Sequence, residues 1–177
     1  MVHYASEGCV GGPELAYLDM GTTVRHVRSE DLPELIHLCA EHAAFERTDY
    51  SPEGKTEALS AMLFAPGARL MCLVAEEQNA LIGYASFSVE VSTWDADRYM
   101  HMDCLFLRPS ARNQGVGLRL MRAIAQHTLA IGITRMQWQT PAFNVDAIRF
   151  YRRMRPVEKE KVRLFLAEEE VRELAGS

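Results

Sequence analysis

The sequence predicts an α/β (α+β) fold, a single domain in which helices flank a central mixed, mostly antiparallel sheet. Three apolar segments joined by short polar connections between residues 70 and 107 are typical of an antiparallel meander. After Pro109 the periodicity alternates between helix and strand, which indicates local parallel pairing. The chain has 177 residues, enough for one such domain with a substantial core.

Periodicity assigns one element to each segment in turn. Alternating polar and apolar residues predict strands, and apolar residues three and four positions apart predict helices. Ser29 and Asn144 are expected to cap the first and last helices, and Gly132 is expected to end the third. The predicted strands cover residues 22–28, 70–75, 81–91, 99–107, 134–140 and 162–167, and the predicted helices cover 29–46, 56–64, 116–131 and 144–154.

Residues 1–21 form an N-terminal extension before the predicted domain, which spans residues 22–177. The extension is Gly-rich and weakly periodic, so a flexible tail, an arm in a dimer and an extra edge strand all remain open. It lacks a basic patch followed by an apolar run. Neither a signal peptide nor a membrane span is therefore expected, and a cytoplasmic location without a membrane partner is the default.

Charge and cysteine content narrow the class of partner. A formal net charge of −5 argues against a general nucleic-acid-binding protein, whose surface is usually basic. The four cysteines, at positions 9, 39, 72 and 104, form no C-x-x-C pair, and no His/Cys cluster has zinc-ligand spacing, so no metal is expected. Three of them lie in apolar runs, which favours buried free thiols in a reducing compartment.

A glycine-containing loop between the meander and the next helix predicts an anion site. It reads Arg112-Asn113-Gln114-Gly115-Val116-Gly117. Glycine allows a ligand to approach the backbone closely, and the free N–H groups and dipole of a helix N-terminus favour negative charge. A pyrophosphate fits such a site without a dedicated lysine, although a tight turn with no ligand remains the alternative.

This loop differs from two other phosphate-binding motifs. It lacks the Gly-Lys-Ser/Thr of a P-loop, so hydrolysis of a nucleoside triphosphate is unsupported. It also lacks the third glycine of a dinucleotide-binding unit and the position of such a unit at the start of the chain.

With these motifs in order, the chain resembles the GNAT superfamily of N-acetyltransferases from about Thr22 to Ala167. One part of the resemblance is the run Cys104–Pro109 that leads into the glycine loop, and the other is Asn144–Tyr151, which is similar to the family's N-x-x-A-x-x-F-Y segment. Within the family the chain looks most like the diamine or polyamine acetyltransferases. The segments that carry this closer likeness are Glu41–Glu46, Leu73–Glu76, Ile82–Ala85 and Trp94.

The resemblance implies a GNAT-like fold whose sheet splays at a site for acetyl-CoA, the acetyl donor. Backbone groups of Leu105, Phe106 and Leu107 would hydrogen-bond the pantetheine arm like an added strand. Asn144 and Ala147 would flank that arm. The amides expected to hold the pyrophosphate are those of Asn113, Gln114, Gly115, Val116, Gly117 and Leu118. The side chains of Arg108 and Arg112 are candidates for phosphate charge, with plain solvation as the alternative.

The resemblance also assigns the two proton transfers. An alkylamine has a pKa of about 10.4, so a group or an ordered water must take its proton. Asp103, where the related enzymes carry a glutamate, is the candidate base, acting directly or through water. Tyr151, at the last position of the second motif, is the candidate acid for the departing thiolate. The alternatives are a carboxylate satisfied by neighbouring backbone and a packed helix aromatic.

The acceptor pocket is the least specified part of the site. Glu46, Asp49 and Trp94 are candidates to line it, with carboxylates pairing the distal charge and the ring offering a cation–π face; an ordinary surface location is the alternative for each. Polyamine enzymes carry an acidic residue next to the base position, where this chain has Cys104, which argues against a polyamine. The glycine that usually ends the helix after Tyr151 is also missing.

The sequence thus predicts an enzyme that moves an acetyl group from acetyl-CoA to a primary amine of a small molecule by direct attack in a ternary complex. The acceptor is a diamine- or polyamine-like molecule or another amine. A protein N-terminal or lysine acetyltransferase and a non-catalytic acyl-CoA-binding sensor remain alternatives. The resemblance implies a homodimer.

Overall fold

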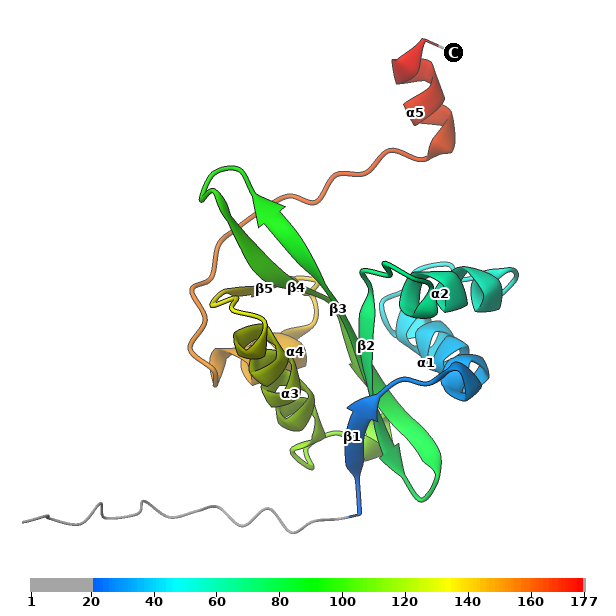
Figure 1. Cartoon of the computed structure of the whole chain (residues 1–177), viewed down its shortest axis with the longest axis vertical. Helices are drawn as coiled ribbons and strands as arrows, with labels where there is room; N and C mark the ends of the chain where they lie inside the picture. Colours follow the sequence, from blue (N-terminus) through cyan, green and yellow to red (C-terminus); the bar gives the residue numbers. More distant parts are fainter. Residues whose placement is uncertain (1–20, 177) are drawn as a thin grey trace, which may run out of the picture. The chain divides into compact units, whose positions relative to one another are not determined.

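The computed structural model describes residues 21–176 (Figure 1). The predicted N-terminal extension, residues 1–21, lies outside the described residues except for Gly21, so its structure stays a prediction. The chain forms two compact units, Met1–Gln139 and Thr140–Ser177, and the sheet belongs to the first.

A five-stranded sheet with the strand order β1-β2-β3-β4-β5 forms the centre of the first unit. The first four strands pair antiparallel and β5 runs parallel to β4, which confirms the predicted mixed, mostly antiparallel sheet. The strands are β1 (Thr23–His26), β2 (Met71–Glu77), β3 (Ala80–Ser92), β4 (Asp97–Leu107) and β5 (Met136–Trp138). A parallel neighbour needs a crossover connection, and α3 (Val116–Ala130) supplies it.

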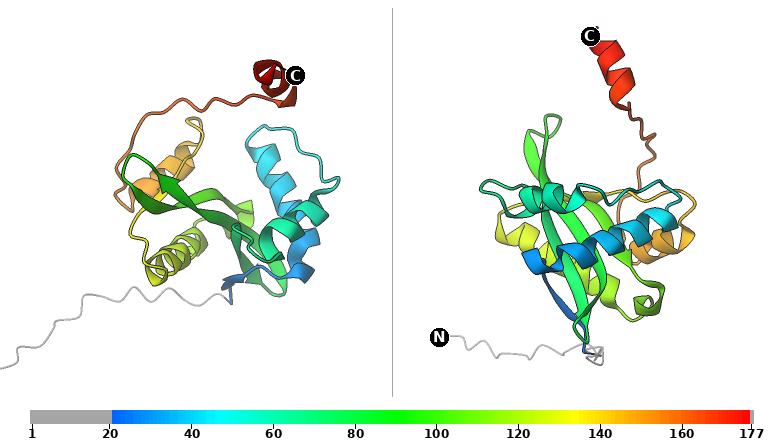
Figure 2. Two further views of the ribbon diagram at one scale, coloured as in Figure 1. Left: turned by 45° about the horizontal axis from the view of Figure 1, so that its top comes forward. Right: turned by 90° about the vertical axis from the view of Figure 1, so that its right-hand side faces the viewer.

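Helices cover both faces of this sheet (Figure 2). The helices α1 (Leu32–Phe45) and α2 (Lys55–Phe64) lie against one face and α3 lies against the other. A layer of buried apolar side chains lies between the sheet and the helices on each face. Burying one such side chain stabilises the fold by about 1.5–3 kcal/mol. The α1 layer contains Leu32, Leu35, Leu38, Val74, Tyr84 and Phe106. The α3 layer contains Phe87, Met100, Met102, Leu120, Met121 and Ile124.

The start of α1 differs from the predicted cap at Ser29. Ser29–Asp31 form a 3-10 turn, and no side chain caps α1 itself. The Asp31 carboxylate instead accepts the Arg28 backbone N–H at 2.7 Å and the Arg25 guanidinium at 2.7 and 2.9 Å. Arg25 on β1 also donates to Glu76 on β2 at 2.6 Å. The hydrogen bonds from Arg25 hold the pKa of Asp31 below its ordinary value, and the pair fastens α1 to the edge of the sheet.

The strand β4 carries one extra residue relative to β3. Ser86 pairs with Cys104 and Phe87 pairs with Met102, so Asp103 has no partner on β3. Such a β-bulge bends the strand and changes which side chains share a face. Cys104 therefore packs in the α1 layer whereas Met102 is buried on the α3 side, and Asp103 is exposed between them.

The second unit contains α4 (Val145–Arg152) and α5 (Glu168–Ala175). The predicted cap of α4 is confirmed, because Asn144 Oδ1 accepts the N–H of Ala147 at 3.1 Å. The predicted strand over 162–167 is wrong: no strand ladder of the described residues includes it, and its apolar side chains are exposed. The helix α5, which the periodicity did not predict, follows it and begins with three glutamates that favour a helix N-terminus.

Candidate active site

The edge of β4 that faces β5 is paired along only part of its length. The last β5 pairing joins Trp138 to Met102, whereas β4 continues to Leu107. Residues 104–107 pair with β3 on one side and extend beyond β5 on the other, and the bulge residue Asp103 precedes them. An extended ligand can add to such an edge through backbone hydrogen bonds. The predicted pantetheine contacts, Leu105, Phe106 and Leu107, all lie in this stretch.

Asp103 lies at the start of this open stretch. Its side chain is exposed, and the thiol of the neighbouring Cys104 lies 3.5 Å from its Oδ2 atom. Burial raises the pKa of Cys104 to about 12, so this thiol stays protonated and donates toward the carboxylate. The bulge thus exposes a carboxylate where the strand edge opens.

The glycine loop ends at the first turn of α3, as predicted. Gly115 is the residue before the helix and has a φ of +81°, a left-handed conformation in which glycine has no side-chain penalty. The first helical bond runs from the Arg119 N–H to the Gly115 carbonyl at 3.1 Å, so the amides of residues 116–118 precede the hydrogen-bonded ladder. These amides and the helix dipole favour an anion such as a pyrophosphate.

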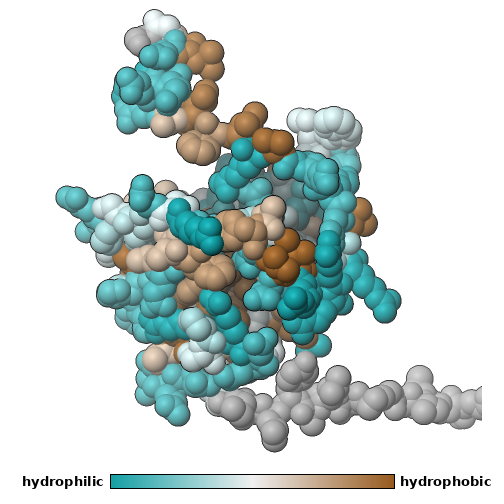
Figure 3. Space-filling model, turned by 180° about the vertical axis from the view of Figure 1, so that it is seen from behind, coloured by the Kyte–Doolittle hydropathy of each residue, from teal (hydrophilic) through white to brown (hydrophobic). Residues whose placement is uncertain are grey.

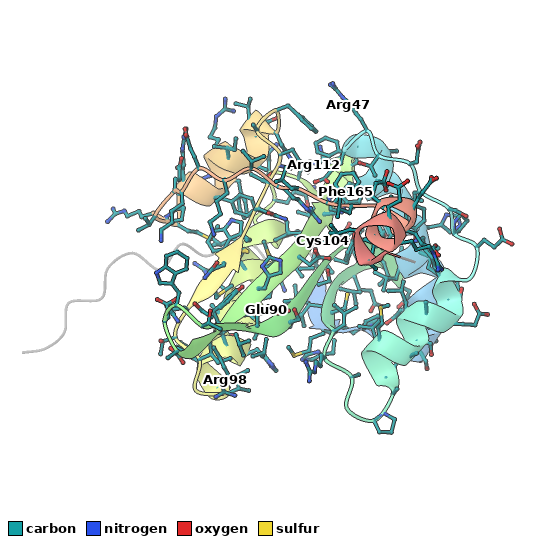
Figure 4. All side chains as sticks on the ribbon, turned by 90° about the horizontal axis from the view of Figure 1, so that it is seen from above. Arg47, Glu90, Arg98, Cys104, Arg112 and Phe165 are labelled. Carbon is teal, nitrogen blue, oxygen red and sulfur yellow. The ribbon has the colours of Figure 1, made fainter. Side chains whose placement is uncertain are left out.

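Arg112 joins this loop to its surroundings (Figure 4). Its Nε donates to the Leu107 carbonyl at 3.0 Å. Its guanidinium carbon lies 4.8 Å from the ring centroid of Phe45 on α1 and 5.8 Å from that of Phe106 on β4. Cation–π contacts of this kind hold the loop against the α1 side of the sheet.

Arg108, the other candidate for phosphate charge, is bound to α1. Its guanidinium donates to Glu41 at 2.9 and 3.0 Å, to Glu34 at 3.4 Å and to the Leu81 carbonyl at 2.7 Å. Those hydrogen bonds raise its pKa, so Arg108 is a fixed positive charge that fastens the end of β4 to the first helix.

A hydrogen-bonded group on the α1 side of the sheet was not predicted from the sequence. His42 Nδ1 lies 3.0 Å from the Tyr84 hydroxyl, and His42 Nε2 lies 3.3 Å from Glu46 Oε1. The imidazole stacks on Phe106, with ring centroids 5.1 Å apart and planes at 22°. Its side chain is 13% exposed. The four-residue spacing from His42 to Glu46 was a visible signal, but Tyr84 lies 42 positions away and only the fold brings it in.

Of the predicted acceptor residues, the structure connects Glu46 to the site and leaves Trp94 apart. Glu46 Oε1 lies 3.3 Å from His42 Nε2, and the charge of Asp103 acts to raise the pKa of that imidazole. Trp94 is 96% exposed in the turn between β3 and β4. From Asp97, at the end of that turn, to Asp103 is about 20 Å of extended strand.

The predicted residues on α4 belong to the second unit. Asn144 and Ala147 form the helix cap, and Tyr151 is 8% exposed with its ring centroid 5.1 Å from that of Phe150. Asp103, the β4 edge and the glycine loop belong to the first unit. The predicted site residues are therefore divided between the two units.

The described residues contain neither a membrane-spanning helix nor a metal-binding cluster. None of the helices within residues 21–176 is long and apolar enough to cross a membrane. Over the same range, no three His, Cys, Asp or Glu side chains gather in an arrangement that would hold a metal ion. The three cysteines that the structure describes, Cys39, Cys72 and Cys104, are free.

The sequence is similar to a known family of enzymes. Residues 33–155 match the acetyltransferase (GNAT) family. The thialysine N-epsilon-acetyltransferase of Mus musculus is 27% identical over 139 residues, which covers 74% of this chain and 81% of that protein. The thialysine N-epsilon-acetyltransferase of Caenorhabditis elegans is 30% identical over 129 residues, covering 73% of this chain and 77% of its own.

Solved structures show the same fold. An integron cassette protein from the mobile metagenome of V. cholerae has a TM-score of 0.73 at 23% identity, covering 89% of this chain and 99% of that structure. An aminoglycoside N-acetyltransferase in complex with CoA has a TM-score of 0.70 at 19% identity, covering 83% and 95%. Since the family match spans well over half of the sequence, the chain belongs to the acetyltransferase (GNAT) family and is an acetyl-CoA-dependent N-acetyltransferase.

Proposed function

We propose that this enzyme transfers the acetyl group of acetyl-CoA to a primary amine of a small molecule by direct attack in a ternary complex. The observation that carries the proposal is the continuity of three features along one segment. The bulge exposes the Asp103 carboxylate, the β4 edge opens at the same point, and the segment then leads into the glycine loop and the first turn of α3.

The donor-binding residues follow from the backbone groups available. The edge of Leu105, Phe106 and Leu107 binds the pantetheine arm as an added strand would. The amides of Asn113 through Leu118 bind the pyrophosphate at the N-terminus of α3. Asn144 and Ala147 flank the pantetheine, and Arg112 positions the loop through its bond to the Leu107 carbonyl. Acetyl-CoA supplies the activated thioester.

The chemistry requires a neutral nucleophile, a polarised carbonyl and a protonated leaving group. Asp103 removes the proton from the acceptor, directly or through an ordered water, and a strand N–H of residues 105–107 polarises the thioester carbonyl. Tyr151 donates its phenolic proton to the departing sulfur. Free thiols and phenols have pKa values of about 8.5 and 10, so this last transfer depends on proximity more than on driving force.

The acceptor is a small cationic amine. Glu46 offers a carboxylate on the α1 side of the sheet and Asp103 offers one at the strand edge, while Arg108 is already bound to Glu41 and Glu34. Relatives named for thialysine support an amine of amino-acid size. Cys104 next to the base position supports an acceptor with fewer positive charges than a polyamine.

We further propose that the enzyme acts in the cytoplasm as a homodimer. The free thiols of the described cysteines support a reducing compartment. Exposed apolar side chains before α5 support self-association, since such a patch usually marks an interface (Figure 3). They are Val162, Leu164, Phe165 and Leu166.

Thiol release from acetyl-CoA across a panel of amines tests the enzymatic proposal. We expect release with small primary amines, and a loss of about 10²-fold or more in Tyr151→Phe. If acetyl-CoA raises the melting temperature but no small amine or peptide yields free thiol, the acyl-CoA sensor replaces the enzyme. Release with peptides alone would point to a protein acetyltransferase, and no stabilisation by acetyl-CoA would contradict the donor site.

A further inference from the structure

The His42 imidazole has a defined partner at each ring nitrogen. A carboxylate only accepts hydrogen bonds, so Nε2 carries a proton whenever it contacts Glu46 Oε1 at 3.3 Å. The Tyr84 hydroxyl, 3.0 Å from Nδ1, can donate to that nitrogen or accept from it. Cys39 and Cys104 interact with the same hydroxyl, which gives it other partners when it rotates. The surroundings of His42 therefore suit both the neutral and the protonated ring.

Three charged groups and one neutral hydroxyl, from four parts of the unit, act on this ring. Glu46 follows α1, Tyr84 comes from β3, Asp103 comes from β4, and Arg112 precedes α3. Burial is the largest influence and lowers the pKa of His42; Glu46 and Asp103 act to raise it, and Arg112 acts to lower it. The lowered pKa favours the uncharged ring, and the Glu46 carboxylate, 3.3 Å from Nε2, can stabilise the ring once it is protonated.

We infer that His42 is a catalytic residue that accepts the proton of the acceptor amine at Nε2, while Tyr84 holds Nδ1 and Glu46 stabilises the imidazolium. This inference rests on the proposed function: it keeps the proposed reaction and its acid, Tyr151, and moves the role of the base from Asp103 to His42. The Glu46 side chain is 36% exposed, so an ammonium ion drawn to its carboxylate arrives beside Nε2. The ammonium replaces Nε2–H as the donor to Glu46. The ring then carries its proton on Nδ1, where the Tyr84 hydroxyl accepts it, and the Nε2 lone pair is free for the proton of the ammonium.

The ordinary proton affinities favour an imidazole over a carboxylate in this role. Typical pKa values are about 6.5 for His, 3.9 for Asp and 10.4 for an alkylammonium. For groups with these ordinary values, proton transfer from an alkylammonium is uphill by about four pKa units to an imidazole and by more than six to a carboxylate. Burial lowers the pKa of His42 and so reduces this advantage of the imidazole. Glu46 and Asp103 act to raise that pKa and restore part of the advantage. Asp103 then serves to hold the cation.

The proton balance of the step is complete. The ammonium gives one proton to Nε2, and the free amine forms the C–N bond to the acetyl carbon. The C–S bond breaks with its electron pair on sulfur, which takes the phenolic proton of Tyr151. The excess proton on nitrogen restores the phenol, and the imidazolium loses its proton to water. An ammonium and a thioester thus give an amide, a thiol and one proton.

The variant His42→Asn tests the inference, because its amide can still bond Tyr84 and cannot titrate. With an alkylamine at pH 7 we expect kcat/KM to fall about 10²–10³-fold. The acid limb of the wild-type pH profile should disappear, and the loss should shrink for an amine whose pKa lies below 7. The affinity for acetyl-CoA should not change. The matched control is His37→Asn, an exposed histidine on the same helix, which should behave as wild type.

The outcomes separate the inference from the proposed function. A His42→Asn enzyme with the wild-type kcat/KM and pH profile overturns the inference alone, and a wild-type enzyme that acetylates no amine overturns both. If the variant does not fold, NMR titration of the His42 ring in the wild type decides. Its pKa should match the acid limb of kcat/KM, and a mismatch overturns the inference.

Discussion

The strand β4 and the segment over 162–167 have similar apolar-rich sequences and opposite environments. β4 pairs with β3 along its length, and its Met100 and Met102 are at most 1% exposed. In the C-terminal segment, Val162, Leu164 and Phe165 are 84–86% exposed. An alternating apolar pattern specifies which face of a strand is buried. The segment becomes a strand only if the edge of a sheet is available to pair with it.

The largest expected effect is the difference in stability between two variants that each lose a phenylalanine, one from each region. Phe87 in the sheet is fully buried, so Phe87→Ala should lower the free energy of unfolding by about 3–5 kcal/mol. Phe165→Ala should change it by less than about 0.5 kcal/mol, because its side chain is already in solvent. Urea denaturation of both variants measures the difference. Equal losses would mean that the two regions are buried alike.

A smaller effect is expected at Gly83 on β3, where β4 leaves no room for a side chain. A Cβ atom on Gly83 would lie 2.3 Å from Leu107 Cδ2 and 2.5 Å from the Phe106 carbonyl oxygen. Gly83→Ala should therefore cost about 1–3 kcal/mol, because the backbone oxygen cannot rotate away. Val91→Ala, at an exposed position of the same strand, is the control. An unchanged denaturation midpoint in Gly83→Ala would show that β4 can move away from β3.

The ion pair that fastens α1 should matter in a pH-dependent manner. Asp31→Asn should cost about 1–3 kcal/mol at pH 7, since Arg25 and the Arg28 amide lose a charged acceptor. The pKa of Asp31 is lowered in the folded state, so its contribution is present above its unfolded pKa and is lost as the pH falls through the folded value. Wild type and variant should converge in acid. A gap that persists at pH 2 would assign the loss to packing.

The smallest expected effect, that of Phe165→Ala on stability, would increase if the protein forms a dimer through this segment. If a second copy covers the segment over 162–167, Phe165→Ala should lower stability in a manner that depends on protein concentration. Melting curves at two concentrations a hundredfold apart, with Val157→Ala as a second exposed position, measure this. Curves that coincide at both concentrations for wild type and variant would argue against self-association through this segment.

The order and type of most elements could be predicted because each carries a local period. The strands from Met71 to Leu107 and the helix after Gly115 follow from alternation, helical spacing and glycine punctuation. The bulge at Asp103 could not be predicted, because the extra residue is defined only by its pairing with β3. The exposed segment before α5 was mistaken for a strand for a related reason, since its sequence does not say which edge would receive it.

The candidate site also contains features that the sequence predicts and features that depend on the folded structure. The glycine loop and the Asn144 cap are local motifs, and the structure contains both. Glu46 was chosen for its charge, but its contact with His42 and the contact of His42 with Tyr84 depend on the packing of α1 against β3. A search for pairs of titratable residues four positions apart would have found the first contact and missed the second.

The bulge at Asp103 also bears on how this active site can change over evolutionary time. Cys104 packs in the α1 layer and Met102 is buried on the α3 side, so a substitution at either position disturbs core packing. Asp103 is the extra residue and is exposed, so its side chain belongs to neither layer. A new side chain there alters the chemistry at the strand edge while the core stays intact. One inserted position therefore lets the sheet accept substitutions at its reactive edge at little cost to folding.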